Sequence, residues 1–111
     1  MSEATYTNVV RLALADRCTL FRNNVGACRT DRGRFIKYGL HEGSADFIGW
    51  TRHDGRAVFV SVEVKGAQTP VAVTQRRWAD NVNKAGGIGL ILREGDDAAA
   101  LFDARLQEIQ G

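Results

Sequence analysis

Apolar residues recur with a helical period in three parts of the chain, and this pattern predicts three helices. The first extends from about residue 3 to 15 with Ser2 as its N-cap, and the second has Thr74 as its cap and ends at Gly86-Gly87. The third begins at Gly95-Asp96. The residues expected on the buried faces are Tyr6, Val9, Val10 and Ala13, then Trp78, Val82 and Ala85, and finally Ala98, Leu101, Phe102 and Ile109.

Shorter apolar or alternating runs between the helices predict five strands, at residues 19–22, 34–38, 46–51, 57–65 and 88–92. A turn or loop at 23–26 makes a short hairpin of the first two, and a tight turn around Asp54-Gly55 pairs the third strand with the fourth. The strand–helix–strand unit from 57 to 92 should be parallel and right-handed. We therefore expect an α/β fold in a single domain spanning 1–111, with a central mixed β-sheet flanked by helices.

Composition narrows the class of protein. The chain has 111 residues, 44% hydrophobic and 25% charged, which is typical of one globular domain and argues against disorder. No apolar run reaches the length of a membrane span, and the first residues do not form a secretory signal. The expected partners therefore include no membrane, and the expected location is the cytoplasm.

Charge is unevenly distributed, although the net charge is only +2. Residues 11–37 contain seven basic and two acidic side chains, whereas residues 94–110 contain five acidic side chains and one arginine. The basic part could face a polyanion such as nucleic acid. Charge alone is better explained by two solvated surfaces.

Candidate chemistry lies on the strand 57–65. Its alternation places Glu63 and Lys65 on one face, roughly 6–7 Å apart. The turn at 53–56 folds Asp46, at the start of the preceding strand, back beside Glu63. Two carboxylates repel each other, and Mg²⁺ or Mn²⁺ would relieve that repulsion and activate water against a phosphodiester, with Lys65 assisting. Taken alone, Glu-x-Lys is a weak motif that most often marks a solvated strand face.

Gln75 lies near the start of the second helix, three residues before Trp78, and is expected to face the sheet. It could orient water or Lys65 at the site. It could equally cap the helix or lie at its edge.

This ordered set resembles the PD-(D/E)XK nuclease superfamily, and most closely the VRR-NUC family. The resemblance rests on Gly43-Ser44-Ala45-Asp46, Glu63-Val64-Lys65, Gln75, an N-terminal helix that carries Glu3, Phe21-Arg22-Asn23-Asn24-Val25-Gly26 and Gly86-Gly87. It covers the chain from Glu3 to about Leu92. One departure is Ala45, where the family often has proline; this affects the backbone before Asp46 rather than the chemistry.

The resemblance implies a small restriction-endonuclease-like fold and a metal held by Asp46, Glu63 and the Val64 carbonyl. Lys65 would be the catalytic lysine and Gln75 a supporting residue. Glu3 would be a further metal ligand, directly or through water, unless its charge merely favours the helix N-terminus.

The family also suggests a substrate and an assembly. Stand-alone members are typical of phages and prophages, resemble Holliday-junction resolvases and act as homodimers. We therefore expect a Mg²⁺- or Mn²⁺-dependent endodeoxyribonuclease that cuts four-way junctions as a homodimer in a phage-infected or bacterial cytoplasm. Exposed Trp50 or the 19–38 hairpin could contribute to the dimer.

With a nuclease as the hypothesis, basic and amide side chains become candidate DNA contacts. They are Arg22, Asn23, Asn24, Arg29, Arg32, Arg34, Lys37, Arg76 and Arg77. Nothing in the sequence suggests a base-reading element, so recognition of DNA shape is expected. Three alternatives stay open: a general endonuclease of flaps, nicks and branched DNA, a non-catalytic DNA-binding module with the nuclease fold, and an α/β interaction protein with a chance Glu-x-Lys.

Overall fold

The computed structural model describes residues 1–24, 26–38 and 40–110, and gives only the backbone for 26–28, 36–38 and residue 110. Its main sheet has four strands in the order β1-β4-β5-β6. These strands are β1 (Thr19–Arg22), β4 (Phe47–His53), β5 (Arg56–Lys65) and β6 (Ile88–Arg93). β4 is antiparallel to β1 and β5, whereas β5 and β6 are parallel, so the sheet is mixed as predicted.

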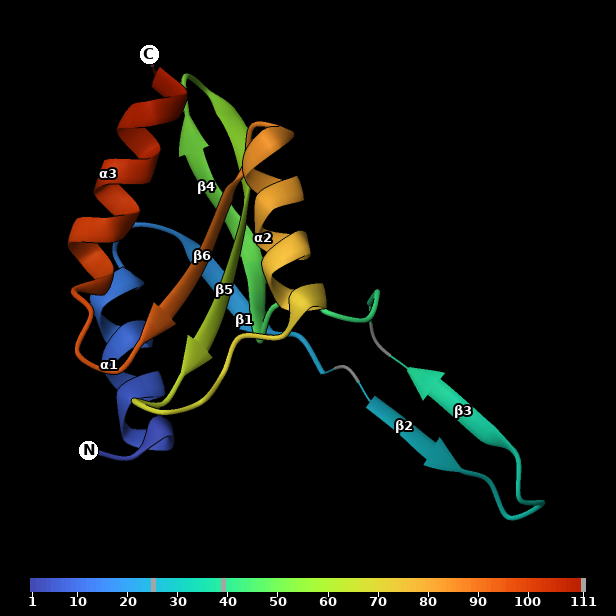
Figure 1. The fold of residues 1–111 in the computed structure, drawn as a ribbon. Coiled ribbons are helices and arrows are strands. Elements are labelled where there is room, and N and C mark those ends of the chain that lie inside the picture. Colours follow the sequence, from blue (N-terminus) through green and yellow to red (C-terminus); the bar gives the residue numbers. More distant parts are fainter. Residues whose placement is uncertain (25, 39, 111) are drawn as a thin grey trace.

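Helices cover both faces of the sheet, as Figure 1 shows. They are α1 (Glu3–Leu14), α2 (Val73–Lys84) and α3 (Ala98–Gln110). α1 and α3 lie on one face and α2 lies on the other. Because β5 and β6 are parallel, the chain must return from the end of β5 to the start of β6, and α2 is the helix of that crossover connection. The expectation of an α/β fold with a mixed sheet flanked by helices is confirmed.

The core lies between the sheet and the α1–α3 layer. Alternation along β5 places its valines on this face, where they contact the buried side chains of α1, β4, β6 and α3. The fully buried or nearly fully buried members are Tyr6, Val10, Leu14, Phe47, Val60, Val62, Val64, Ile88, Leu92, Ala98 and Phe102. Glu63 and Lys65 point to the opposite face, beneath the start of α2.

The predicted hairpin of strands 19–22 and 34–38 is wrong. β1 pairs with β4, with Thr19 opposite Trp50, and the 34–38 segment pairs with a strand that the sequence did not predict. The second sheet consists of β2 (Gly26–Arg29) and β3 (Phe35–Tyr38), and Figure 1 shows it projecting away from the four-stranded sheet. Gly26 is therefore a strand residue rather than part of a turn, and Val25 lies outside the described residues.

Some predicted helix ends and faces also differ. α2 begins at Val73 and its N-cap is Ala72, so Thr74 is already inside the helix. In α2 the fully buried residue is Ala79, while Ala85 is exposed. Val9 and Leu101 were expected in the core but are 43% and 41% exposed, because the buried stripes of α1 and α3 pass beside them. No described helix has the length and apolar character needed to cross a membrane.

Candidate active site

The register of β4 and β5 brings Asp46 to Glu63. The pairing ends with Phe47 opposite Val62, so the next residues outward along the two strands are Asp46 and Glu63. Asp46 precedes β4 directly, and its Oδ2 accepts a hydrogen bond of 2.9 Å from the backbone N–H of Val64. The carboxylate of Asp46 is thus fixed against the part of β5 that extends beyond β4.

Glu63 is the centre of a buried polar cluster. Its Oε2 lies 3.6 Å from Lys65 Nζ and accepts a hydrogen bond of 3.3 Å from Gln75 Nε2. The side chains of Glu63 and Lys65 are each 8% exposed. Residues from two elements, β5 and α2, therefore converge on one carboxylate oxygen, and Asp46 adds the second carboxylate from the loop before β4.

Gln75 contacts both the start of its helix and the acidic cluster, and its role at the site stays a prediction. Its Oε1 accepts a hydrogen bond of 3.0 Å from the backbone N–H of Ala72, which satisfies a donor at the start of α2. Its Nε2 contacts Glu63 rather than Lys65. Since Ala72 has no side-chain acceptor, Gln75 is the residue that completes this helix end.

The electrostatics of the cluster leave negative charge in excess. Burial, and then the neighbouring charge of Asp46, raise the pKa of Glu63 to about 7, although Lys65 acts in the opposite direction. One ammonium group does not fully compensate two carboxylates, of which that of Glu63 is buried and that of Asp46 half-buried. A divalent cation with oxygen ligands fits this charge balance.

The described residues contain no group of three or more His, Cys, Asp or Glu side chains that could hold a metal ion. Two carboxylates are available at this point, from Asp46 and Glu63, so a bound ion would also need backbone oxygen and water. That requirement is compatible with the predicted Val64 carbonyl, and Mg²⁺ in particular keeps several waters.

Glu3 lies at the rim of the site. It lines a hollow of about 410 Å³ together with Ala4, Thr7, Asn8, Arg22, Asp46 and Phe47. A Cβ atom built on Gly66, the residue after Lys65, would lie 3.5 Å from Glu3 Oε2. Glu3 therefore reaches the end of β5, where its predicted role as a further ligand stays a prediction.

The candidate DNA contacts fall into two groups. Arg22 lines the hollow beside Asp46, and Arg76 and Arg77 are exposed next to Gln75 in the first turn of α2. Exposed Arg29, Arg32 and Arg34 belong to the projecting β2–β3 hairpin, and the side chain of Lys37 lies outside the described residues. The structure thus places Arg22 in the hollow beside Asp46, Arg76 and Arg77 next to Gln75 along α2, and three other arginines on an extension.

Asn23 is tied to the chain segment before Asp46. Its Nδ2 donates to Ser44 Oγ at 2.8 Å and to the Ala45 carbonyl at 2.9 Å, and its backbone N–H donates to the Asp46 carbonyl at 2.7 Å. A role in DNA binding stays a prediction, but its side-chain hydrogens already have partners within the protein. Asn24, by contrast, is exposed.

Two contributors to this region were not predicted. Ser44, 9% exposed, accepts from Asn23; the Gly43-Ser44-Ala45-Asp46 motif contains it but gave it no role. Arg11 lies on the same face of α1 as Glu3 and Thr7, at intervals of four residues, and its guanidinium lies over the Phe47 ring. The spacing of Glu3, Thr7 and Arg11 was the available signal for Arg11.

The sequence profile of the VRR-NUC domain matches residues 6–93. The chain belongs to the VRR-NUC family. No curated protein and no solved structure matches it significantly. The matched range contains Asp46, Glu63, Lys65 and Gln75, whereas Glu3 precedes it. VRR-NUC membership supports nuclease activity, the hydrolysis of phosphodiester bonds with DNA as the substrate, and the family's superfamily usually employs divalent metal ions.

Proposed function

We propose that this VRR-NUC protein is a Mg²⁺- or Mn²⁺-dependent endodeoxyribonuclease that acts as one domain over residues 1–111 and resolves four-way DNA junctions as a homodimer in a bacterial or phage-infected cytoplasm. The observation that carries the nuclease assignment is the convergence of Lys65 and Gln75 on Glu63 Oε2, with Asp46 hydrogen-bonded to the next residue of β5. Acids and a lysine at one buried strand end are suited to phosphodiester hydrolysis.

The proposed metal ligands are Asp46, Glu63 and the Val64 carbonyl, with Glu3 joining through water. When bound, the cation supplies Lewis-acid activation of water and stabilises charge on the phosphodiester. Gln75 holds Glu63 in its orientation from the first turn of α2. Lys65, close to Glu63, positions the attacking water and donates a hydrogen bond to the oxygen that gains negative charge.

The proposed DNA surface combines Arg22, Arg76 and Arg77 near the site with the basic side chains of the β2–β3 hairpin, including Lys37, and with Asn24 and Asn23. Contacts from these groups to phosphates give affinity without reading sequence. A hairpin that carries four basic residues and one acidic residue extends the reach of this surface beyond the sheet. Such an extension suits branched DNA, whose arms diverge from the cutting site.

The homodimer follows from the chemistry of paired cuts. One small domain with one site cuts one strand, so two symmetric cuts require two copies related by a two-fold axis. Exposed aromatic side chains support an interface on the sheet face left uncovered beside α2. Phe21 and Trp50 are 47% and 48% exposed, with their ring centroids 6.1 Å apart in an edge-to-face arrangement.

The test is cleavage of a labelled four-way junction and a linear duplex of the same sequence, with Mg²⁺, Mn²⁺ or EDTA. Lys65→Ala is the inactive variant, and Lys84→Ala, exposed at the far end of α2, is the matched lysine control. Metal-dependent paired cuts in the junction alone, retained by Lys84→Ala and lost by Lys65→Ala, are the expected result. Cleavage of flaps, nicks and duplex alike would identify a general endonuclease. Junction binding without cleavage by the wild-type protein would identify a non-catalytic binding module.

A further inference from the structure

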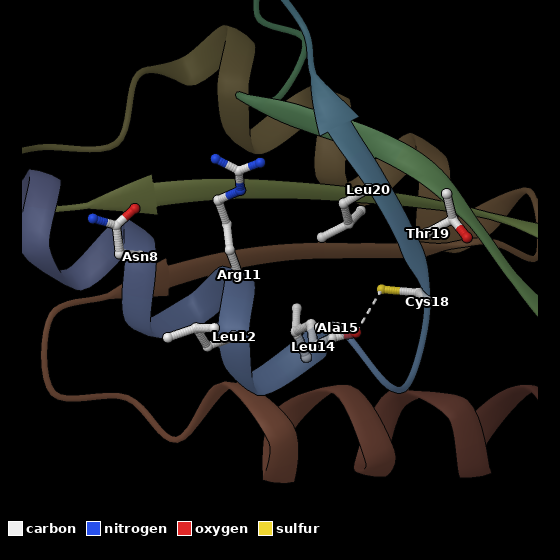
Figure 2. Close-up of a pocket in the computed structure, with 8 residues that line it drawn as sticks. All are labelled: Asn8, Arg11, Leu12, Leu14, Ala15, Cys18, Thr19 and Leu20. Atoms are coloured by element: carbon white, nitrogen blue, oxygen red, sulfur yellow. Dashed lines mark hydrogen bonds between the residues drawn. The ribbon is translucent and has the colours of Figure 1, made fainter.

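A second hollow adjoins the one that Glu3, Arg22 and Asp46 line at the candidate site. It has a volume of about 770 Å³ and lies between α1 and β1, as Figure 2 shows. Its lining consists of Asn8, Arg11, Leu12, Leu14, Ala15, Cys18, Thr19 and Leu20. Asn8 also lines the hollow that contains Asp46, so the two hollows adjoin along α1. Together they form a trough that leads from the candidate active site along the edge of the sheet.

Arg11, which lines the second hollow, and Arg22, which lines the first, lie against the same aromatic ring. The guanidinium carbons of Arg11 and Arg22 lie 5.4 and 5.1 Å from the centroid of the same ring, that of Phe47. Phe47 is 1% exposed, so its ring is a fixed base on which both cations rest. Figure 2 shows Arg11 extending from α1 toward the sheet, on the side where Leu20 of β1 also points into the hollow.

The positive charge of this arginine pair, Arg11 with Arg22, is not compensated. Neither residue forms an ion pair with any carboxylate in the described part of the chain. Arg17, in contrast, is bound to both Asp16 and Asp103. Two neighbouring cations repel each other unless an anion lies between or beside them, and a guanidinium group matches the oxygen pair of a phosphate.

We propose that the arginine pair binds a backbone phosphate of the DNA strand, adjacent to the phosphate that is cut, and that the strand continues in the trough between α1 and β1. This inference rests on the proposed nuclease function. Two observations identify DNA as the molecule that occupies the trough. The arginine pair is positively charged, and Arg22 lines the same hollow as Asp46, so an anion bound to Arg22 lies next to the candidate cutting site. Asn8, which is exposed on α1, adds a polar group for a phosphate or sugar further along.

The proposal is tested by DNA binding in EDTA, where no metal-dependent cleavage occurs. Fluorescence anisotropy gives the affinity of each variant for a labelled junction over a series of salt concentrations. Each lost phosphate contact should reduce the slope of log affinity against log salt by about 0.9. The double variant Arg11→Gln/Arg22→Gln should show that full reduction and each single variant a part of it, since glutamine keeps part of the packing on Phe47 without the charge. Arg56→Gln is the matched control, because Arg56 is exposed at the opposite end of β5.

The outcomes separate this site from the nuclease function. An unchanged slope in folded Arg11→Gln, while the wild-type protein cuts DNA normally, would overturn the arginine pair and leave the function intact. If the variants show a reduced slope but the wild-type protein cuts no DNA, the arginine pair is supported and the nuclease function is refuted. A change in oligomeric mass for Arg11→Gln with no change in slope would overturn the proposal in favour of a protein partner at the trough. Thermal unfolding of each variant confirms that the folded proteins are being compared.

Discussion

The side-chain amide of Gln75 connects the first turn of α2 to the carboxylate of Glu63, with 3.3 Å between Gln75 Nε2 and Glu63 Oε2. The same amide accepts the backbone hydrogen bond of Ala72. Gln75→Ala should therefore lower both stability and activity. We expect a loss of about 1 kcal/mol in the free energy of unfolding from the lost cap, and a decrease of roughly 10- to 100-fold in cleavage or metal affinity from the freed Glu63.

Urea denaturation and single-turnover cleavage measure the two effects of Gln75→Ala separately. Gln75→Glu is the informative companion, because its carboxylate can still accept from Ala72 but cannot donate to Glu63. It should retain most of the cap and lose activity. Full activity of Gln75→Glu would show that the contact with Glu63 has no part in catalysis.

The raised pKa of Glu63 predicts a pH dependence of stability in the metal-free protein. An unfolded glutamate ionises near pH 4.5, whereas in the folded protein the pKa is about 7 because of burial and the charge of Asp46. Between these values the folded state binds the extra proton, so the free energy of unfolding decreases as the pH rises through this window. Glu63→Gln removes this contribution.

In EDTA, the Tm of Glu63→Gln should exceed that of the wild type by a margin that widens from about pH 5 to about pH 8. Adding Mg²⁺ or Mn²⁺ at the higher pH should stabilise the wild type more than the variant, because an ion bound to the folded state raises its stability. A margin independent of pH would contradict the raised pKa. Equal stabilisation by metal would remove Glu63 from the ligands.

Asn23 is predicted to position the segment that carries Asp46. Asn23→Ala loses the hydrogen bonds to Ser44 and Ala45, and we expect a cost of about 2 kcal/mol in the free energy of unfolding. Asn24→Ala is the matched control, since that neighbour is exposed. If both variants lose DNA affinity and neither loses stability, the two asparagines act as DNA contacts instead.

Gly43 allows the loop before Asp46 to approach α2 closely. Its φ is +88°, and an added Cβ would lie 2.6 Å from the Thr74 carbonyl oxygen. Gly55 has a comparable φ of +75° with nothing within 4 Å of an added Cβ. Gly55→Ala should therefore cost only the backbone strain, about 1–2 kcal/mol, and Gly43→Ala clearly more in the same urea titration. Equal costs would mean that the loop moves away from α2 without penalty.

The exposed pair of Phe21 and Trp50 predicts a test of the dimer. Trp50→Ala should shift the protein from dimer to monomer in light scattering, and should convert paired junction cuts into single nicks. Leu101→Ala is a suitable control, because Leu101 is also apolar and 41% exposed but lies on α3. A Trp50→Ala protein that stays dimeric places the interface elsewhere, with the β2–β3 hairpin as the next candidate.

The part of the site carried by β4 and β5 could be predicted because it depends on local patterns. Alternation along β5 fixes the shared face of Glu63 and Lys65, and the Asp54-Gly55 turn fixes which residue lies beside them. The order of elements from β4 to β6 also followed from short-range signals. These features need no knowledge of contacts between distant segments.

The features that escaped prediction depend on long-range pairing or on side-chain geometry. β2 is only four residues long and its sequence shows no alternation of apolar and polar residues. The turn that ends at Gly33, whose φ is +77°, brings it to its partner β3. β1 was predicted to pair with 34–38 because these two segments follow each other along the chain. It instead forms the edge of the main sheet, beside β4. Likewise, the position of Arg11 over Phe47 joins α1 to β4, a contact between segments that are far apart in sequence.

The length of the two-residue turn between β4 and β5 fixes the register of the two strands, and so determines which residues lie side by side at the candidate site. Asp54 and Gly55 have positive φ values of 51° and 75°, and His53 pairs directly with Arg56. About 25 Å of strand separates this turn from Asp46 and Glu63. One inserted residue would shift the pairing by one position and set Asp46 against the opposite face of β5. Natural length variation, commonly tolerated in exposed turns, should therefore be absent here and accumulate in the tip between β2 and β3.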